Sequence, residues 1–289
     1  MSFTLQDAAL LLQQGGVVAF PTETVYGLGA NALNAQAVRR VYELKGRPAT
    51  SPLIVHVSSI EMARELSSAW PAKAEELALQ HWPGPLTLVV PKAPRIPDEV
   101  TAGLSTVGLR MPRHPTALDL IRTAGLPLAA PSANKFTELS PTTAAHVRAA
   151  FGDAVPVLDG GPCAVGLEST VVAVDADGSV RLLRPGMLTL DEAVTGAAKE
   201  HESPGMHHKH YSPRTARVML VASLQDAPPE AVLLKLPEDP EAYAAQLYSK
   251  LHDLDAQGVK LIAIEIPHDP DSRWDAVRDR LRRAASLQL

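Results

Sequence analysis

The stretch PTETVYGLGANA, residues 21–32, decides how the N-terminal part of the chain folds. The apolar run at residues 17–20 precedes it and indicates a short buried strand. Asn34 follows it and can cap a helix whose apolar positions recur at helical spacing. We therefore expect a strand, a polar loop and a helix in succession, with Gly27 and Gly29 letting backbone N–H groups approach a ligand.

The same spacing also fits a tight strand-to-helix connection with solvated polar residues. Residues 21–32 lack the glycine–lysine ending of a P-loop and the full glycine spacing of a dinucleotide fingerprint. The stretch alone therefore leaves both interpretations open.

Length and composition favour a globular protein of two domains. The chain has 289 residues, of which 46% are hydrophobic, and a formal net charge of −5. That charge argues against a surface that binds nucleic acid over its whole extent, although a local basic groove is compatible with it. The single Cys163 cannot form an internal disulfide, which suits a reducing cytosol. Residues 1–14 resemble an amphipathic helix more than a signal peptide. No apolar run approaches the ~18 residues that a membrane-spanning helix needs. We expect a cytoplasmic protein without a membrane segment.

Strands and helices alternate irregularly over the first 200 residues, which favours an α/β fold with a mixed, twisted sheet and flanking helices. Helices are expected at residues 5–14, 35–44, 60–69, 72–82 and 116–123, from Ser140 as cap with Pro141 at the first helical position, and from a capping box of Thr189 and Glu192. Strands are expected at residues 17–20, 53–57, 86–90, 105–112, 155–159, 170–174 and 180–183, and a short apolar run from residue 128 breaks into a small polar loop at 131–134.

The character of the chain changes at about residue 202. Residues 203–213 lack apolar periodicity and read as a linker. Strands at 217–221, 232–236 and 261–266 and helices at 240–257 and 274–286 then indicate a small Rossmann-like α/β domain, with the charged residues of 274–283 on a solvated helix face. We divide the chain into domains 1–201 and 216–289 and a linker, 202–215.

Polar side chains cluster at the predicted strand ends and in the adjoining loops, where α/β proteins usually bind ligands. They are Thr24, Arg47, Ser51, His56, Arg110, Ser132, Asn134, Ser169 and Arg184. Lys45 and the three arginines could form an anion site, because guanidinium groups bind phosphate and carboxylate through two hydrogen bonds. A surface ion pair explains each of these cations better when it is taken alone, and their repeated placement at strand ends is what favours the anion site.

Other polar residues admit simpler interpretations. His56 could be a catalyst or a satisfied core histidine. Ser132 and Ser169 lack the G-x-S-x-G elbow and a matching His–Asp pair, which argues against a serine hydrolase. A solvated linker explains His207, His208 and His210 better than a metal site.

Several motifs occur in an order that resembles the YrdC-like family of threonylcarbamoyl-AMP synthases in its two-domain form. They are PTETVYGLGANA, KGRP followed by PLIVHV, STVGLRMP, APSAN, SPT, GLESTVV, LRPG and the linker SPGMHHKHYSP. The resemblance is dense over residues 5–215. Each motif alone is weak, but the ordered set is specific.

The resemblance implies an enzyme that condenses L-threonine, bicarbonate and ATP into threonylcarbamoyl-adenylate and pyrophosphate, with Mg²⁺ bound through the ATP phosphates. By the family's motifs, the threonine-binding residues are Thr24, His56, Arg110, Ala130 and Ser169. The ATP-binding residues are Lys45, Arg47, Ser51, Thr106, Ser132, Asn134, Ser140, Arg184 and Tyr211. No enzyme nucleophile is expected, and the linker would act as a lid that excludes water. A separate tRNA threonylcarbamoyl transferase complex would consume the product, and a weak contact with tRNA itself is compatible with the resemblance.

Three departures from the family pattern stand out. Ser51 replaces the usual Asn, KFTEL at residues 135–139 replaces a small Ser-Gly stretch, and the C-terminal domain is shorter than usual. Two alternatives to the synthase therefore stay open: a non-catalytic RNA-binding module of the same fold, and a relative that uses carbamoyl phosphate. Strong, steeply salt-dependent RNA affinity without ATP turnover would favour the first, and activity with another carbamoyl donor would favour the second.

Overall fold

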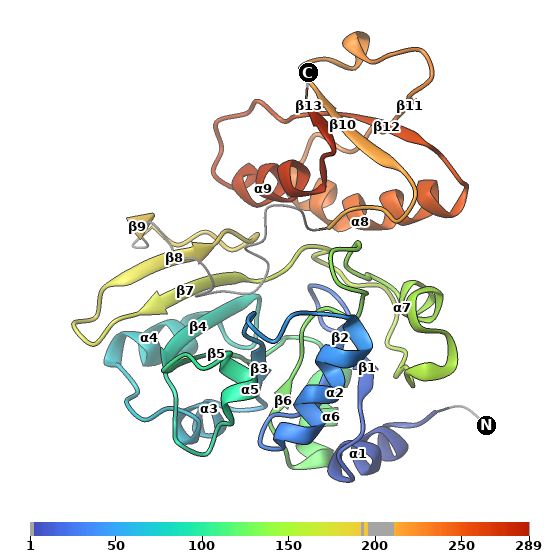
Figure 1. Ribbon diagram of the computed structural model, residues 1–289. Coiled ribbons are helices and arrows are strands. Elements are labelled where there is room, and N and C mark those ends of the chain that lie inside the picture. The colour runs from blue at the N-terminus through green and yellow to red at the C-terminus, as the bar shows by residue number, and fades with distance from the viewer. Residues whose placement is uncertain (1–2, 192–193, 196–210, 289) are drawn as a thin grey trace.

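The computed structural model describes residues 3–191, 194–195 and 211–288 and shows two lobes, each built on its own sheet (Figure 1). The N-terminal lobe holds a nine-stranded sheet and the C-terminal lobe a four-stranded one. The expected linker and the expected boundary at 201/202 lie largely outside the described residues, as do His207, His208 and His210. None of the described helices is long and apolar enough to cross a membrane.

The large sheet is mixed, as the irregular alternation of elements predicts. Its strands run in the order β1-β2-β6-β3-β5-β4-β7-β8-β9 and pair in both parallel and antiparallel fashion. The strands are β1 (Val18–Phe20), β2 (Gly27–Asn31), β3 (Ile54–His56), β4 (Leu86–Pro91), β5 (Thr106–Arg110), β6 (Leu128–Ala129), β7 (Thr170–Val174), β8 (Val180–Arg184) and β9 (Val194–Thr195).

Helices pack around this sheet, and most begin at a residue whose side chain or ring suits a helix start. They are α1 (Leu5–Gln13), α2 (Ala35–Lys45), α3 (Ile60–Glu65), α4 (Ala72–His81), α5 (Asp98–Thr101), α6 (Pro115–Ala124) and α7 (Ala144–Phe151). Asn34 caps α2 as expected, accepting hydrogen bonds from the Gln36 and Ala37 amides.

The expected loop at residues 21–32 is wrong in its second half. Gly27–Asn31 forms strand β2, which pairs antiparallel with β1. A Cβ at Gly29 would lie 2.6 Å from Cε1 of Phe20, so this glycine makes room for an aromatic ring and not for a ligand. Gly27 does border a cavity, described below.

Two other expectations are wrong, and a third falls mostly outside the described residues. Ser140 does not begin a helix: α7 starts at Ala144 with Thr143 as cap, and the Ser140 hydroxyl donates instead to Glu168. No strand spans 155–159, where the described backbone makes only a bridge between Val157 and Ala19. Of the helix expected from the capping box of Thr189 and Glu192, residues 192–193 and 196–201 lie outside the described residues, and Val194–Thr195 forms strand β9.

The C-terminal lobe is a small α/β domain with a wholly parallel sheet, consistent with the expected Rossmann-like fold. Its strands run in the order β11-β12-β10-β13. The elements are β10 (Arg217–Val221), β11 (Val232–Leu233), α8 (Pro240–Ala256), β12 (Leu261–Glu265), α9 (Trp274–Ala284) and β13 (Leu287–Gln288). Both long helices lie on the side of this sheet that faces the N-terminal lobe (Figure 1).

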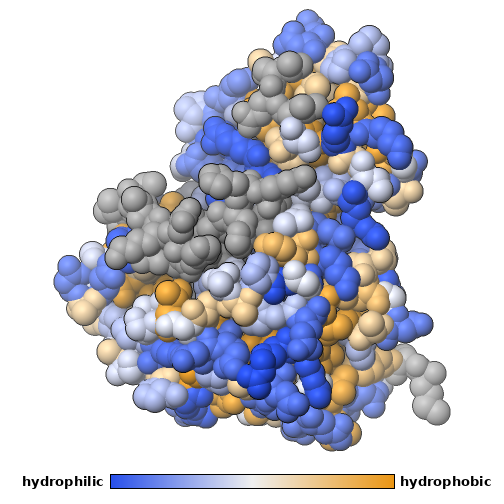
Figure 2. Space-filling model, in the orientation of Figure 1, coloured by the Kyte–Doolittle hydropathy of each residue, from blue (hydrophilic) through white to orange (hydrophobic). Residues whose placement is uncertain are grey.

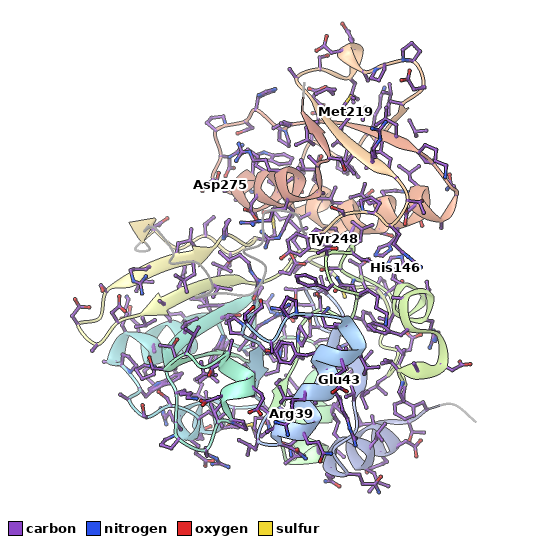
Figure 3. The ribbon with its side chains drawn as sticks, in the orientation of Figure 1. Arg39, Glu43, His146, Met219, Tyr248 and Asp275 are labelled. Carbon is purple, nitrogen blue, oxygen red and sulfur yellow. The ribbon has the colours of Figure 1, made fainter. Side chains whose placement is uncertain are left out.

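The two lobes share an apolar core. Val25, Leu139 and Leu167 of the N-terminal lobe belong to the same buried cluster as the residues of α8 and α9. The ring of His146 on α7 stacks on that of His252 on α8 at a centroid distance of 3.9 Å. In Figure 3, His146 and Tyr248 both lie at this junction. Outside it, hydrophilic residues predominate on the face shown in Figure 2, with hydrophobic ones in scattered groups.

The close approach of Gly29 to Phe20 generates a stability prediction. Gly29→Ala forces the Phe20 ring or the β1–β2 pairing to shift, so we expect the free energy of unfolding in urea to fall by about 1–3 kcal/mol. Leu79→Ala is the control, because that side chain is 66% exposed and its loss should cost less than about 0.5 kcal/mol. Equal urea midpoints for Gly29→Ala and the unchanged protein would show that β1 and β2 do not pack as described.

Candidate functional site

A cavity lies where the last residues of β3, β5 and β8 and the residue before β7 meet the loops after β1 and β6. Most of the residues predicted to bind ligands line it together. They are Thr24, Arg47, His56, Arg110, Ala130, Ser132, Ser169, Arg184 and Tyr211.

Strand pairing explains why residues so distant in sequence converge. Strands β3 and β5 are parallel neighbours whose last residues, His56 and Arg110, are register partners. Strand β6 runs antiparallel along the other side of β3, and Ala130 follows it with its amide bonded to the Ile54 carbonyl at 2.9 Å. The sheet therefore presents an imidazole and a guanidinium side by side on the cavity wall.

Arg110 is buried, with 3% of its surface exposed, and is held from three directions. Nη1 donates to the Thr24 hydroxyl at 2.9 Å, and Nε donates to the Gly84 carbonyl at 3.3 Å. Nη2 lies 2.8 Å from Oε1 of Glu23 in an ion pair. The partner carboxylate partly balances the buried charge and fixes the direction of the guanidinium.

His56 is a neutral histidine in this site. Burial and the charge of Arg110 lower its pKa to about 3. Its ring meets that of Phe20 edge to face at a centroid distance of 5.9 Å, and Nδ1 is buried without a hydrogen-bond partner among the described residues. A ring nitrogen left unpaired beside a cavity is suited to bind a polar group of a ligand.

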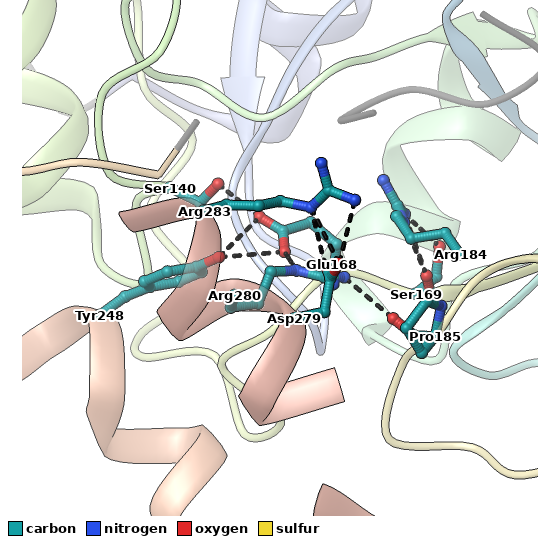
Figure 4. Close-up of polar contacts among 9 residues, drawn as sticks. All are labelled: Ser140, Glu168, Ser169, Arg184, Pro185, Tyr248, Asp279, Arg280 and Arg283. Carbon is teal, nitrogen blue, oxygen red and sulfur yellow. Dashed lines mark hydrogen bonds and ion pairs between the residues drawn. The ribbon is translucent and has the colours of Figure 1, made fainter. Parts of the chain in front are cut away.

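Ser169, directly before β7, and Arg184, the last residue of the adjacent strand β8, form one unit. Nε and Nη2 of Arg184 donate to the Ser169 carbonyl at 3.1 and 3.0 Å, and Nη2 also reaches the Ser169 hydroxyl at 3.1 Å. The hydroxyl of Thr87 on β4 lies 2.8 Å from that of Ser169. These contacts place a fixed hydroxyl next to a buried cation (Figure 4).

Arg47 adds another buried guanidinium, 7% exposed, on the α2 side of the cavity. Nη2 donates to the Ser51 hydroxyl and, at 3.2 Å, to the Pro52 carbonyl. Nε has no hydrogen-bond partner among the described residues, and burial lowers the pKa of Arg47 to about 10. Ser51 thus supports Arg47 here and does not itself line the cavity.

Four further predicted residues also lie outside the cavity lining. Lys45 is buried, and Nζ donates to the carbonyls of Ser132 and Asn134 at 2.6 Å each, which braces the loop after β6. Burial lowers the pKa of Lys45 well below its usual value. Thr106 borders a smaller neighbouring hollow, and Ser140 binds Glu168.

Sequence reasoning missed Glu168 and Arg280, which the structure brings together. Glu168 lines the cavity, and Arg280 of α9 donates to it from the other lobe (Figure 4). The expectation that the charged residues of 274–283 form a solvated face is wrong for Arg280, which is 0% exposed. The position of Glu168 within GLESTVV was a local signal, but nothing local marks its partner 112 residues away.

The site's charge suits an anionic ligand and offers little to a bare metal ion. Arg47, Arg110 and Arg184 all face the cavity, and the carboxylate of Glu168 is engaged by Arg280. Among the described residues no group of three His, Cys, Asp or Glu side chains could hold a metal. Cys163 is buried, and burial raises the pKa of its thiol to about 12, so it is no nucleophile.

Comparison with known proteins covers nearly the whole chain. The family model Sua5_yciO_yrdC, described as telomere recombination, matches residues 10–186, and the model of the threonylcarbamoyl-AMP synthase C-terminal domain matches residues 179–286. The threonylcarbamoyl-AMP synthase of Pyrococcus abyssi is 39% identical over 99% of this chain and 95% of its own length. That of Bacillus subtilis is 49% identical over 72% of this chain and 64% of its own length.

Solved structures agree with these matches. The crystal structure of P. abyssi Sua5 complexed with L-threonine superposes with a TM-score of 0.88 at 35% identity, covering 99% of this chain and 96% of that one. The crystal structure of E. coli YciO shares the fold over 66% of this chain and 92% of its own, with a TM-score of 0.56 at 19% identity. The first comparison spans both lobes, so the small C-terminal lobe is part of the shared architecture.

The neutral state of His56 predicts a pH dependence of stability. In the unfolded chain its imidazole takes up a proton below about pH 6.5, whereas in the folded protein it stays neutral down to about pH 3. The free energy of unfolding should therefore fall as pH drops from 6.5 towards 4, by about 1.4 kcal/mol per pH unit for this one proton. His56→Gln should remove that share of the slope in urea titrations, while His81→Gln, at a partly exposed position, should leave it unchanged. Equal slopes for His56→Gln and the unchanged protein would show that His56 is not buried in its neutral form.

Proposed function

The chain belongs to the Sua5/YciO/YrdC family, and we propose that it acts as a threonylcarbamoyl-AMP synthase. It condenses L-threonine, bicarbonate and ATP into threonylcarbamoyl-adenylate and pyrophosphate, which makes it a nucleotidyltransferase. One observation carries this proposal: a single cavity gathers three buried guanidinium groups, a neutral histidine and several hydroxyls. The likeness to a Sua5 structure solved with L-threonine supports it.

Threonine is assigned to the side of the cavity formed by β3, β5 and the loop after β1. Arg110 pairs with its carboxylate, since the guanidinium is buried and already oriented by Glu23 and Thr24. Nδ1 of His56 is available for the amine or the hydroxyl. Ala130 supplies a small apolar wall and Ser169 a hydroxyl whose position Arg184 fixes.

ATP is assigned to the side lined by Arg47, Ser132, Arg184 and Tyr211. The two guanidinium groups would offset the negative charge of the triphosphate, and Tyr211 offers a ring to the nucleoside. Lys45, Ser51 and Asn134 support this side by holding Arg47 and the loop after β6. Thr106 and Ser140 remain predictions for nucleotide contacts.

The chemistry needs orientation and charge, not an enzyme nucleophile. The neutral amine of threonine attacks bicarbonate, water leaves, and a carbamate forms. A carbamate oxygen then attacks the α-phosphorus of ATP, and pyrophosphate leaves. Both steps gather negative charge in one place, which preorganised guanidinium groups stabilise in a site of low dielectric. Burial of His56, Arg110 and Ser169 limits the access of water to the carbamate.

Mg²⁺ fits this site only as a companion of the triphosphate. The described residues offer no cluster of metal ligands, so the ion would be held through phosphate oxygens, as is common for nucleotide-bound Mg²⁺. When bound, it supplies further neutralisation of the phosphate charge.

The proposed product requires a second enzyme that transfers its threonylcarbamoyl group. Threonylcarbamoyl-adenylate is a reactive mixed anhydride, so a separate transferase must take it to tRNA, and a direct tRNA contact by this chain is a further, weaker proposal. We place this activity in the cytoplasm, in keeping with a single buried cysteine. The likeness to a Sua5 structure solved with L-threonine favours the synthase over the RNA-binding alternative.

Pyrophosphate release tests the proposed function directly. We expect release from ATP that requires both L-threonine and bicarbonate in the presence of Mg²⁺, with L-serine much poorer because it lacks the methyl group. Release independent of threonine would indicate a different acceptor, and no release together with tight RNA binding would favour the binding module.

Arg110→Ala tests the threonine pocket. Loss of the carboxylate partner should raise the threonine KM by roughly 30- to 1,000-fold, equivalent to about 2–4 kcal/mol, and affect the ATP KM less. Arg110→Lys keeps a positive charge opposite Glu23 but loses the two-pronged guanidinium. Its threonine KM should therefore lie between those of the unchanged protein and Arg110→Ala. Arg113→Ala is the control, since its side chain is exposed and donates to the Pro83 carbonyl. An unchanged threonine KM and kcat in Arg110→Ala would remove Arg110 from the site.

A further inference from the structure

We propose that Arg280, on helix α9 of the C-terminal lobe, is a positioning residue for the cleft of the N-terminal lobe. It holds Glu168 and Pro185 and through them fixes Ser169 and Arg184. The inference deepens the proposed function and rests on it, because it assigns the C-terminal lobe a task in substrate binding.

The guanidinium of Arg280 is completely buried and contacts both lobes. Nε donates to Oε2 of Glu168 at 2.7 Å, and Nη2 donates to the Pro185 carbonyl at 3.1 Å. Nη1 donates to Oδ2 of Asp279, its neighbour on α9, at 2.6 Å. Figure 4 shows the side chain reaching from α9 toward the segments that carry Glu168 and Pro185.

These contacts and two peptide bonds link Arg280, Glu168, Ser169, Arg184 and Pro185 into a closed ring at the cavity wall. Glu168 is joined by a peptide bond to Ser169, whose carbonyl and hydroxyl accept hydrogen bonds from Arg184. Arg184 is joined by a peptide bond to Pro185, and Arg280 binds both Glu168 and Pro185. A single guanidinium from the other lobe therefore fixes the two segments that carry a threonine-side hydroxyl and a phosphate-side cation.

Glu168 is fully engaged in this arrangement. Its carboxylate accepts from the Ser140 hydroxyl at 2.6 Å and from Tyr248 of α8 at 3.2 Å, in addition to Arg280. Burial alone would raise its pKa, but the charges of Arg280 and Arg184 hold that pKa below the ordinary value. The carboxylate therefore stays ionised and keeps its hold on both helices of the C-terminal lobe.

Arg280 also reaches the nucleotide side of the cavity. Its guanidinium lies 5.3 Å from the ring centroid of Tyr211, within the range of a cation–π contact. The Tyr211 ring packs against Tyr248 at a centroid distance of 5.8 Å. Arg280 does not line the cavity, so it acts through Glu168, Pro185 and Tyr211 and touches no substrate.

The charges in this network are balanced. Arg280 contacts Glu168 and Asp279, and Asp279 is also paired with Arg283 at 3.0 Å. Two carboxylates thus meet two guanidinium groups. Removal of Arg280 alone leaves Glu168 buried beside the cavity without its strongest partner, so its carboxylate must shift or take up a proton.

The test compares Arg280→Met with Arg280→Lys in the full chain. Methionine keeps the length of the stem and removes the charge, and the KM for threonine and for ATP should both rise at least tenfold. Lysine can pair with Glu168 but cannot reach Pro185 at the same time, so it should recover part of the loss. Arg282→Met is the matched control on the same helix, at an exposed position, and should leave both KM values within twofold.

Three outcomes distinguish a positioning role of Arg280 from a purely structural one. A purely structural role would lower the melting temperature and the active fraction, and hence kcat, but leave both KM values of the folded enzyme unchanged, and that result would overturn the proposal. If Arg280→Met fails to fold, Arg280→Lys decides by the same KM readout: unchanged values overturn the proposal, and raised values support it. If the unchanged enzyme releases no pyrophosphate, the proposed function fails, while calorimetric titration of threonine and ATP into the same variants still measures what Arg280 does for binding.

Discussion

A guanidinium group cannot be buried without acceptors, and this constraint governs the architecture around the cavity. Arg47, Arg110, Arg184 and Arg280 are each less than 10% exposed. Carbonyls, hydroxyls or carboxylates hold every one of them, from the adjoining loop for Arg47 and from more distant segments for the other three. The fold supplies these acceptors where strands end and loops turn inward. In the proposed reaction, the cations that must meet carboxylate and phosphate charge are thus oriented before the ligand arrives.

The two lobes pack closely against each other and are not independent domains joined only by a linker. Their shared apolar cluster brings α8 and α9 against the N-terminal lobe, and a Cβ on Gly166 would lie 2.4 Å from the carbonyl oxygen of Ala244 on α8. Backbone therefore packs on backbone at this junction. Such close packing lets one side chain, Arg280, transmit the position of α9 to the cavity wall.

Sequence reasoning predicted the mixed sheet, most element positions and most of the polar residues that line the cavity, because these rest on periodicity and on a specific ordered set of motifs. It failed at β2, where two glycines suggested a loop although one of them accommodates the Phe20 ring. It also misread Ser140 as a helix cap, since the competing partner Glu168 is 28 residues away. The Arg280–Glu168 pair spans 112 residues, and a charged helix face gives no local sign of which arginine turns inward.

The most direct test of the account is mass spectrometry of the product formed from L-threonine, ATP and ¹³C-labelled bicarbonate. The account predicts an adenylate that contains threonine and one labelled carbon, formed in step with pyrophosphate. AMP and pyrophosphate without an adenylate that carries the label would contradict the proposed chemistry, even if ATP is consumed.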